Sequence, residues 1–111
     1  MEMKIHLDSD IFEIVEKGTK DIEVRLNDEK RKKLQVGDTL IFLKRPLDDE
    51  SITKRVKTLE YYSSFEELVE HYEMKRIYLD GCSKATYLKT MERFYTKEEQ
   101  DKYGVVAITF E

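Results

Sequence analysis

One ten-residue segment carries the strongest structural signal in this sequence: Gly18-Thr19-Lys20-Asp21-Ile22-Glu23-Val24-Arg25-Leu26-Asn27. Its apolar residues, Ile22, Val24 and Leu26, alternate with polar ones, which is the period of a β-strand with one buried face. The glycine at its start is typical of a turn before such a strand. The segment therefore predicts a short, half-buried strand whose opposite face is polar.

The polar face of this strand holds an acid, a guanidinium group and an amide in one row, from Glu23, Arg25 and Asn27. Such a row can exchange hydrogen bonds with the edge of a nucleobase, and Arg25 can pair with a phosphate or with Glu23. Lys20 lies an odd number of residues from Glu23, so the two can meet only if Lys20 sits in the turn before the strand. The alternative interpretation is an ordinary ion pair on a solvated sheet face.

The sequence on either side of this segment predicts a domain in which strands dominate the first half. Alternating or apolar runs predict strands at residues 4–7, 39–43 and 52–62, besides the strand at 22–26. A helix is expected between the caps Asp8-Ser9-Asp10 and the terminating Gly18, and one helical turn within residues 29–34. In the long strand, the expected inward positions are Val56, Leu59 and Tyr61.

The second half is predicted to be helical until its last strand. Ser64 and Glu67 fit a capping box, and a second helix is expected from about residue 83 to 95. Residues 96–102 are expected to form a charged connector. Residues 105–110 are apolar almost throughout, which predicts a central strand buried on both faces. The expected order of elements is β-α-β-β-β-α-α-β, an α+β fold.

Length and composition exclude several classes of protein. The chain has 111 residues with 11% aromatic residues, which suits one globular domain over residues 1–111. No apolar run approaches the roughly 20 residues that cross a bilayer, and the N-terminus lacks the pattern of a secretory signal, so we expect a cytoplasmic protein. Cys82 is the single cysteine, and His6 and His71 have no partners at ligand spacing, so we expect no metal. No dinucleotide or Walker motif is present, and no cofactor is expected.

The basic residues are concentrated in one part of the chain. The net charge is −4, but residues 30–57 contain nine basic and four acidic residues and so carry +5. The strands at 39–43 and 52–62 would form a hairpin with aromatic neighbours, which makes its basic residues candidate RNA contacts. These candidates are Lys44, Arg45, Lys54, Arg55 and Lys57. The alternative is a solvated mixture of surface charges.

The pattern Gly18-x-Lys20-x-x-Glu23-x-Arg25 resembles the G-x-K-x-x-E-x-R motif of the ASCH domain family. The resemblance extends to the preceding strand and helix, to the turn Val36-Gly37-Asp38 and to Tyr103-Gly104-Val105 before the last strand. It implies a PUA-like fold, a mixed β-barrel with flanking helices. It also implies that Lys20, Glu23 and Arg25 line a cleft between barrel and helix that takes RNA or a nucleotide-like ligand.

We therefore expect an RNA- or nucleotide-binding domain whose ligand contacts include Lys20, Glu23, Arg25, Asn27 and Arg93. In this hypothesis Lys20 contacts a phosphate or a carbonyl, Glu23 accepts from an exocyclic amine, and Arg25 orients Glu23 or binds phosphate. A positive surface that joins the cleft to residues 30–57 would support it.

The resemblance also implies an enzymatic alternative, because some small ASCH proteins are amidohydrolases that remove the acyl group from N-acetylated cytidine. Those relatives carry a threonine where this chain has Glu23. Lys20 and Glu23 would then form the catalytic acid–base pair, with a later glutamate among Glu66, Glu67 and Glu70. This alternative predicts a narrow pocket with a buried Lys20 of lowered pKa. A protein-interaction module, with an exposed apolar patch, is a third possibility.

Overall fold

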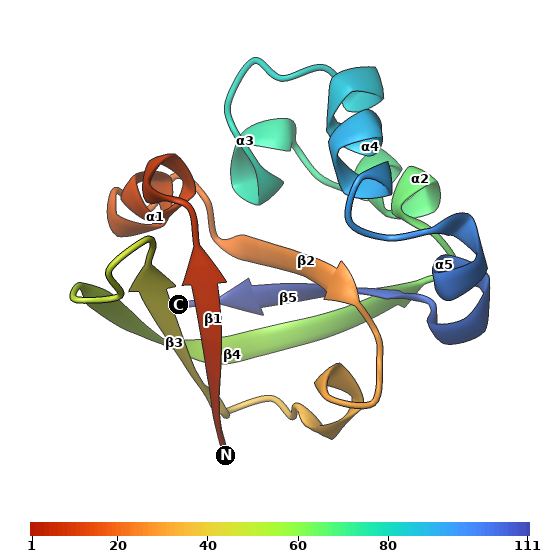
Figure 1. Cartoon of the computed structure of the whole chain (residues 1–111). Helices are drawn as coiled ribbons and strands as arrows, with labels where there is room; N and C mark the ends of the chain where they lie inside the picture. The colour runs from red at the N-terminus through yellow and green to blue at the C-terminus, as the bar shows by residue number, and fades with distance from the viewer.

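The computed structural model describes all residues from 1 to 111 and contains one mixed five-stranded sheet (Figure 1). The strands are β1 (Glu2–Leu7), β2 (Ile22–Leu26), β3 (Thr39–Lys44), β4 (Ser51–Tyr62) and β5 (Val105–Phe110). Their order in the sheet is β1-β3-β4-β5-β2, in which β1 pairs with β3 in parallel and the other pairs are antiparallel. The sheet curls into an open half-barrel, which confirms the predicted PUA-like fold class.

The inside of the half-barrel holds one hydrophobic core. Helix α1 (Ser9–Glu16) lies over it and contributes Phe12 and Val15, both at most 1% exposed. The strands contribute the inward-facing residues of their alternating patterns, among them Ile5, Leu40 and Phe42. Burial of each such side chain stabilises the fold by about 1.5–3 kcal/mol, so this core fixes the curvature of the sheet and the position of α1.

The last strand, β5, is buried on both faces as the sequence predicts. Val106, Ile108 and Phe110 face the barrel core, whereas Val105 and Ala107 face a second core. Because β5 also pairs with β4 on one side and with β2 on the other, none of its edges is open. The strand β2 is thereby held at the border between the two cores.

The second core lies between β2, β5 and a layer of short helices (Figure 1). These are α2 (Phe65–Leu68), η2 (Val69–His71), α3 (Met74–Ile77), α4 (Lys84–Glu92) and α5 (Lys97–Tyr103). Half of the predicted capping box is confirmed, since Ser64 Oγ accepts from the Glu67 backbone N–H, whereas the Glu67 carboxylate accepts from Ser63. The predicted connector at residues 96–102 is wrong. Thr96 and Glu99 form a capping box there, which starts α5 in spite of the density of charge.

Two of the three inward positions predicted for β4 are correct. Val56 is buried and Leu59 packs against the barrel core, with a bulge between Val56 and Thr58 that explains their odd spacing. Tyr61 is 58% exposed, so its predicted burial is wrong. It shares the face of Leu59, but it lies near the end of β4 that points away from α1 (Figure 1). Strand periodicity gives the face of a residue and not how far the core extends beneath it.

None of the helices has the length and apolar character that a membrane span requires. No group of three or more His, Cys, Asp or Glu side chains is arranged to hold a metal ion.

Candidate functional site

The turn between α1 and β2 places Lys20 beside Glu23. Gly18 ends the helix with a φ of +84°, and the backbone N–H groups of Thr19 and Lys20 both donate to the Ile14 carbonyl. The strand begins only at Ile22, so Lys20 lies in the turn and not in the strand. This is the condition under which the sequence allows Lys20 and Glu23 to meet, and it is fulfilled.

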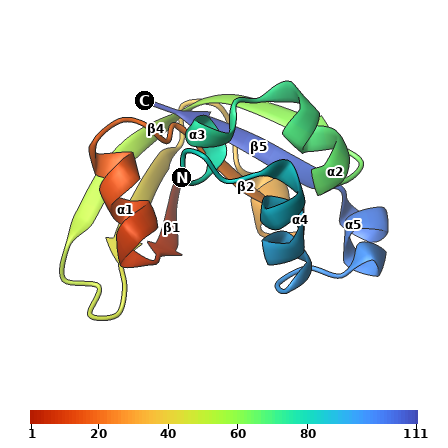
Figure 2. The same cartoon turned by 90° about the horizontal axis from the view of Figure 1, so that it is seen from above.

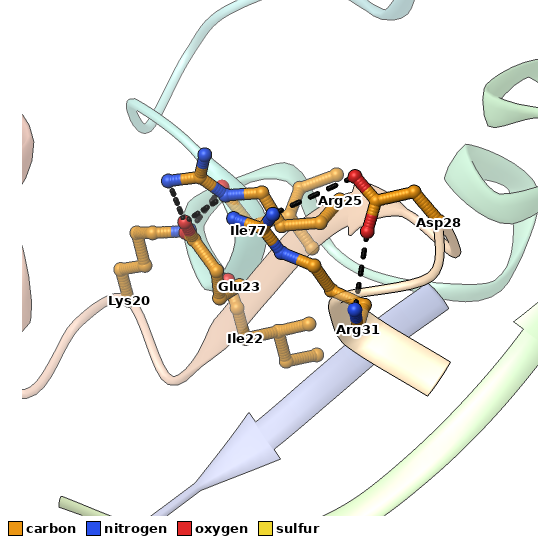
Figure 3. A network of polar contacts seen from close by, with 7 residues as sticks. All are labelled: Lys20, Ile22, Glu23, Arg25, Asp28, Arg31 and Ile77. Carbon is orange, nitrogen blue, oxygen red and sulfur yellow. Dashed lines mark hydrogen bonds and ion pairs between the residues drawn. The ribbon is translucent and has the colours of Figure 1, made fainter. Parts of the chain in front are cut away.

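Lys20, Glu23 and Arg25 form one network of charges (Figure 3). Lys20 Nζ lies 3.1 Å from Glu23 Oε1, while Arg25 Nε and Nη2 each lie 2.7 Å from Glu23 Oε2. One carboxylate thus holds two cations, one on each oxygen. Glu23 is only 5% exposed, so the alternative of an ion pair on a solvated sheet face is wrong.

All three N–H bonds of the Lys20 ammonium group are used within the protein. Besides Glu23, the ammonium donates to the carbonyl of Ile22 and, at 2.8 Å, to the carbonyl of Ile77 in α3. The residue is 3% exposed. Burial lowers the pKa of Lys20, and the attraction of Glu23 opposes that shift. Lys20 therefore joins β2 to the helical layer and has no hydrogen left for a ligand.

The other two members of the network differ in how far they reach solvent. Burial alone would raise the pKa of Glu23, but the charges of Arg25 and Lys20 outweigh it, so the pKa is lowered. Burial likewise works against the charge of Arg25, yet the neighbouring Glu23 raises its pKa overall. The Arg25 side chain is 23% exposed, against 6% for Glu23 and 3% for Lys20. Arg25 is thus the member of the network that solvent or a ligand can reach.

A second ion pair ties the same turn to α3. Asp21 accepts two hydrogen bonds from the guanidinium of Arg76, at 2.9 and 3.0 Å, and its backbone N–H donates to the Arg76 carbonyl. Together with the bond from Lys20 to Ile77, these contacts fix α3 against the start of β2. The geometry of the charged network therefore depends on the position of the helical layer.

The network forms the floor of a cleft of about 270 Å³. One wall comes from the end of β1, from α1 and from the loop after β3, and the other comes from α3, α4 and the residues after α4. In Figure 2, α1 and α4 lie on opposite sides of the molecule, with α3 between them. Its volume is near the lower end of the roughly 300–1,000 Å³ typical of small-molecule sites. The lining residues are, on the floor, Lys20, Glu23, Val24 and Arg25; on the first wall, His6, Leu7, Asp8, Ile11 and Arg45; on the second, Ile77, Tyr78, Tyr87, Met91, Phe94 and Tyr95.

The mouth of the cleft opens into a shallow hollow of about 740 Å³. The two share His6, Asp8 and Arg45, so they form one continuous depression. In the hollow, His6 Nδ1 lies 3.1 Å from a carboxylate oxygen of Asp48, which connects β1 to the loop between β3 and β4. The depression thus narrows from a polar mouth to a charged floor with one aromatic wall.

The aromatic wall was not predicted as part of a site. Tyr87 is 2% exposed, and burial raises its pKa, whereas Phe94 is 68% exposed. From the sequence, this helix shows an apolar stripe that includes Met91 and Tyr95, and such a stripe indicates a core face. Tyr87 and Met91 are four residues apart on one face of α4, and Tyr95 follows the end of the helix, but the spacing alone does not show that these side chains border a cleft.

Two predicted ligand contacts lie outside the cleft. Asn27 follows the end of β2, where its backbone N–H donates to the Gly104 carbonyl and its buried Oδ1 has no hydrogen-bond partner. Arg93 is exposed at the C-terminal end of α4 and does not line the cleft, although Phe94 next to it does. Near Arg25, Asp28 and Arg31 form a separate ion pair, with Arg31 Nη1 3.6 Å from Asp28 Oδ2 (Figure 3).

The five basic candidates of the hairpin are divided between its two ends. Lys54 and Arg55 pair with Leu40 and Thr39 at the start of β3, and Lys57 follows them. Lys44 and Arg45 lie at the other end of β3, about 15 Å away at some 3.3 Å per residue. Lys44 is paired with Glu50 and Glu13, at 3.3 and 3.8 Å. Among the five, only Arg45 lines the cleft.

The glutamates considered as an additional catalytic group lie elsewhere. Glu70 pairs with Lys84 at 2.9 Å, Glu67 is bonded to Ser63, and Glu66 borders a separate hollow beside α5. The carboxylates that line the cleft are Glu23 and Asp8, and no Ser, Thr or Cys side chain is among the lining residues.

Comparisons with known proteins show the family and the fold of the chain. Residues 5–111 match the family model of the ASCH domain. The fold is similar to the crystal structure of the hypothetical protein PH0355, with a TM-score of 0.86, 36% sequence identity, and coverage of 100% of this chain and 98% of that chain. It is also similar to the solution NMR structure of protein PF0455 from Pyrococcus furiosus, with a TM-score of 0.80, 33% identity, and coverage of 100% and 96%. No curated protein sequence matches the chain.

Proposed function

The chain belongs to the ASCH domain family, and from that premise we propose that it binds RNA or a nucleotide-derived ligand in the cleft above Lys20, Glu23 and Arg25. The proposal rests most directly on the exposure and the free N–H donors of Arg25. Glu23 occupies its Nε and part of Nη2, which leaves further N–H donors on a side chain that is 23% exposed in the cleft. Those donors suit the acceptor atoms of a base edge or a phosphate.

The electrostatics of the floor favour an electron-rich or anionic group. Two cations and one carboxylate leave a net charge of +1. Because Lys20 and Glu23 bind each other, their role is to hold Arg25 in place, and Arg25 makes the contact. The aromatic wall supplies the apolar surface that a base requires. This division of roles differs from the expectation that Lys20 itself contacts the ligand.

The distribution of charge limits the extent of RNA that the site would hold. A long RNA tract would be expected to follow a continuous basic surface, but Lys44 is neutralised by Glu50 and Glu13, and Lys54, Arg55 and Lys57 lie at the far end of the hairpin. The cleft is better suited to one or a few unpaired nucleotides that approach from the mouth beside Arg45.

Calorimetric titration with single-stranded RNA hexamers and with the four ribonucleoside 5′-monophosphates tests the proposal. We expect saturable binding that weakens at least tenfold in Arg25→Gln and is unchanged in Arg93→Gln, which removes an exposed arginine outside the cleft. Absence of saturable binding to every probe would contradict the proposal, as would equal losses in the two variants.

A small amidohydrolase is the second candidate, and one observation favours it: Lys20 is buried, with a lowered pKa, beside a carboxylate in a narrow cleft. Two observations weigh against it. The lowered pKa of Glu23 makes it a weak base for water at neutral pH, and the hydrogens of Lys20 are all committed. Turnover of N-acylated cytidine by the wild type that is abolished in Lys20→Ala would establish the enzyme, and no turnover at high protein concentration would eliminate this substrate.

A further inference from the structure

Phe94 is an aromatic side chain that the fold leaves uncovered at the edge of the cleft. It follows α4 directly, lines the cleft and is 68% exposed, whereas Tyr87 on the same wall is 2% exposed. Its ring centroid lies 6.5 Å from that of Tyr95, so it extends the aromatic surface of the wall towards solvent. Phe94 is not among the side chains that form or pack against either hydrophobic core.

Arg45 occupies the opposite wall. It is exposed, lines both the cleft and the hollow at its mouth, and takes part in none of the ion pairs of the structure, whereas Lys44 beside it is paired with two glutamates. Its backbone N–H donates to the Leu7 carbonyl at 2.8 Å, which anchors the loop to the end of β1. The guanidinium group of Arg45 is therefore held near the cleft and is free to meet a ligand.

Aromatic rings and guanidinium planes are the two kinds of protein surface on which unpaired bases stack. Here the ring of Phe94 lies on one side of the cleft and the side chain of Arg45 on the other, with hydrogen-bond donors at the floor. We propose that Phe94 and Arg45 form the two faces of a slot for a single unpaired nucleobase, whose acceptor-bearing edge points to Arg25. This inference rests on the proposed function and adds to it the residues that select a planar ligand.

The two faces of the slot act on the base through different properties. Phe94 acts through its flat apolar surface, so leucine at this position keeps the apolar character but removes the plane. Arg45 acts through a planar cation, so lysine keeps the charge but removes the plane. A site that only attracts phosphate would accept both substitutions. Phe94→Leu and Arg45→Lys therefore distinguish recognition of a base from attraction of a phosphate.

The chain contains no tryptophan, which makes Phe94→Trp a single fluorescent reporter within the slot. We expect the four ribonucleoside 5′-monophosphates to quench its emission, with wild-type affinity or tighter, and ribose 5-phosphate to leave it unchanged. Tyr61→Trp is the matched control, because Tyr61 is similarly exposed, at 58%, but lies outside the cleft. Its emission should not respond to any of these compounds.

Calorimetry on the wild type, Phe94→Leu, Arg45→Lys and Arg45→Gln completes the test. We expect at least a tenfold loss of nucleotide affinity in Phe94→Leu and in both Arg45 variants, while ribose 5-phosphate, which lacks a base, binds all four proteins equally weakly. Tighter binding of an RNA hexamer than of any mononucleotide would identify RNA as the source of the base, and the reverse would identify a free nucleotide.

The outcomes separate this inference from the function on which it rests. If the wild type binds neither the hexamer nor a mononucleotide, the proposed function fails and the slot fails with it. If the wild type binds but Phe94→Leu binds equally well, or if Arg45→Lys retains the affinity of the wild type, the stacking slot is wrong and the proposed function stands. Both side chains are exposed, so circular dichroism should show that these variants fold normally.

Discussion

The strand β2 and the hairpin of β3 and β4 both carry basic side chains that the sequence identifies as candidate contacts, yet the fold arranges them in opposite ways. Lys20 in the turn before β2 and Arg25 in the strand converge on one buried carboxylate at the floor of a cleft. In the hairpin, the five basic residues are divided between its two ends, and only Arg45 lines the cleft. Spacing at the period of a strand therefore predicted which side chains gather at one cleft better than local density of charge did.

The two regions also differ in what their charges contribute to stability. Removal of water from the β2 network makes each of its charges dependent on its partners, because a buried ion that loses its partner keeps its desolvation cost. The exposed charges of the hairpin remain solvated whether or not they are paired. Substitutions that remove one partner should therefore separate the two regions sharply.

The largest expected effect follows from Glu23→Gln. This change leaves Lys20 and Arg25 without their shared counter-charge, and we expect the free energy of unfolding to fall by about 3–5 kcal/mol in urea denaturation. The matched hairpin variant is Glu50→Gln, which removes one of the two carboxylates beside Lys44. It should produce no measurable change. Similar losses in the two variants would show that the buried and exposed networks do not differ as described.

A smaller loss is expected for Lys20→Met. Methionine fills the apolar part of the site, and Glu23 keeps its pair with Arg25, so no buried charge is left alone. The carbonyls of Ile22 and Ile77 lose a donor, at a cost of about 1–3 kcal/mol. Urea denaturation should show this loss, and ligand affinity should fall less than in Arg25→Gln. A loss greater than that of Glu23→Gln would contradict this account of the network.

The pH dependence of stability provides a finer test of the same network. The pKa of Glu23 lies below its ordinary value of 4.5, because Arg25 and Lys20 outweigh the effect of burial. As the pH falls, the unfolded chain takes up this proton first, so the stabilisation from Glu23 is complete above pH 4.5 and is lost as the pH falls through the folded-state pKa. Below pH 4.5 the wild type should therefore lose stability more steeply than Glu23→Gln. Parallel curves would exclude a lowered pKa for this carboxyl.

The smallest effect is expected at the far end of the hairpin. Exchange of Lys54 and Lys57 for glutamine in one double variant removes two basic residues distant from the cleft. We expect affinity for an RNA hexamer, and its dependence on salt concentration, to stay within twofold of the wild type. A clearly shallower salt dependence would mean that RNA also contacts the hairpin, since each lost phosphate contact reduces that slope.

Much of the fold follows from patterns in the sequence. The alternation of Ile22, Val24 and Leu26 predicts the strand and its apolar face, and the apolar run from Val105 to Phe110 predicts a strand buried on both sides. Parity shows that Lys20 can meet Glu23 only from the turn before the strand, which is where it lies. In each case a period of two or a turn glycine specifies the local geometry before any tertiary contact is known.

The parts that were not predicted depend either on a local signal hidden among charged residues or on contacts between distant segments. Residues 96–102 are dense in charge, and only the capping box at Thr96 and Glu99 marks the start of a helix there. Asn27 shares the strand parity of Glu23 and Arg25, but the strand ends before it and the chain turns away. Phe94 is a large apolar residue next to Tyr95, which by itself suggests a core position, and only the tertiary fold shows that nothing covers it.

The three hydrogen bonds of Lys20 also have a consequence for the chemical reactivity of the chain. Amine-directed reagents require a neutral, accessible lysine, and this ammonium is buried and fully engaged with Glu23, Ile22 and Ile77. Acetylating or methylating reagents should therefore modify the exposed lysines first and reach Lys20 only when α3 separates from the turn before β2. The rate at which this one side chain becomes labelled would then report how often the helical layer opens.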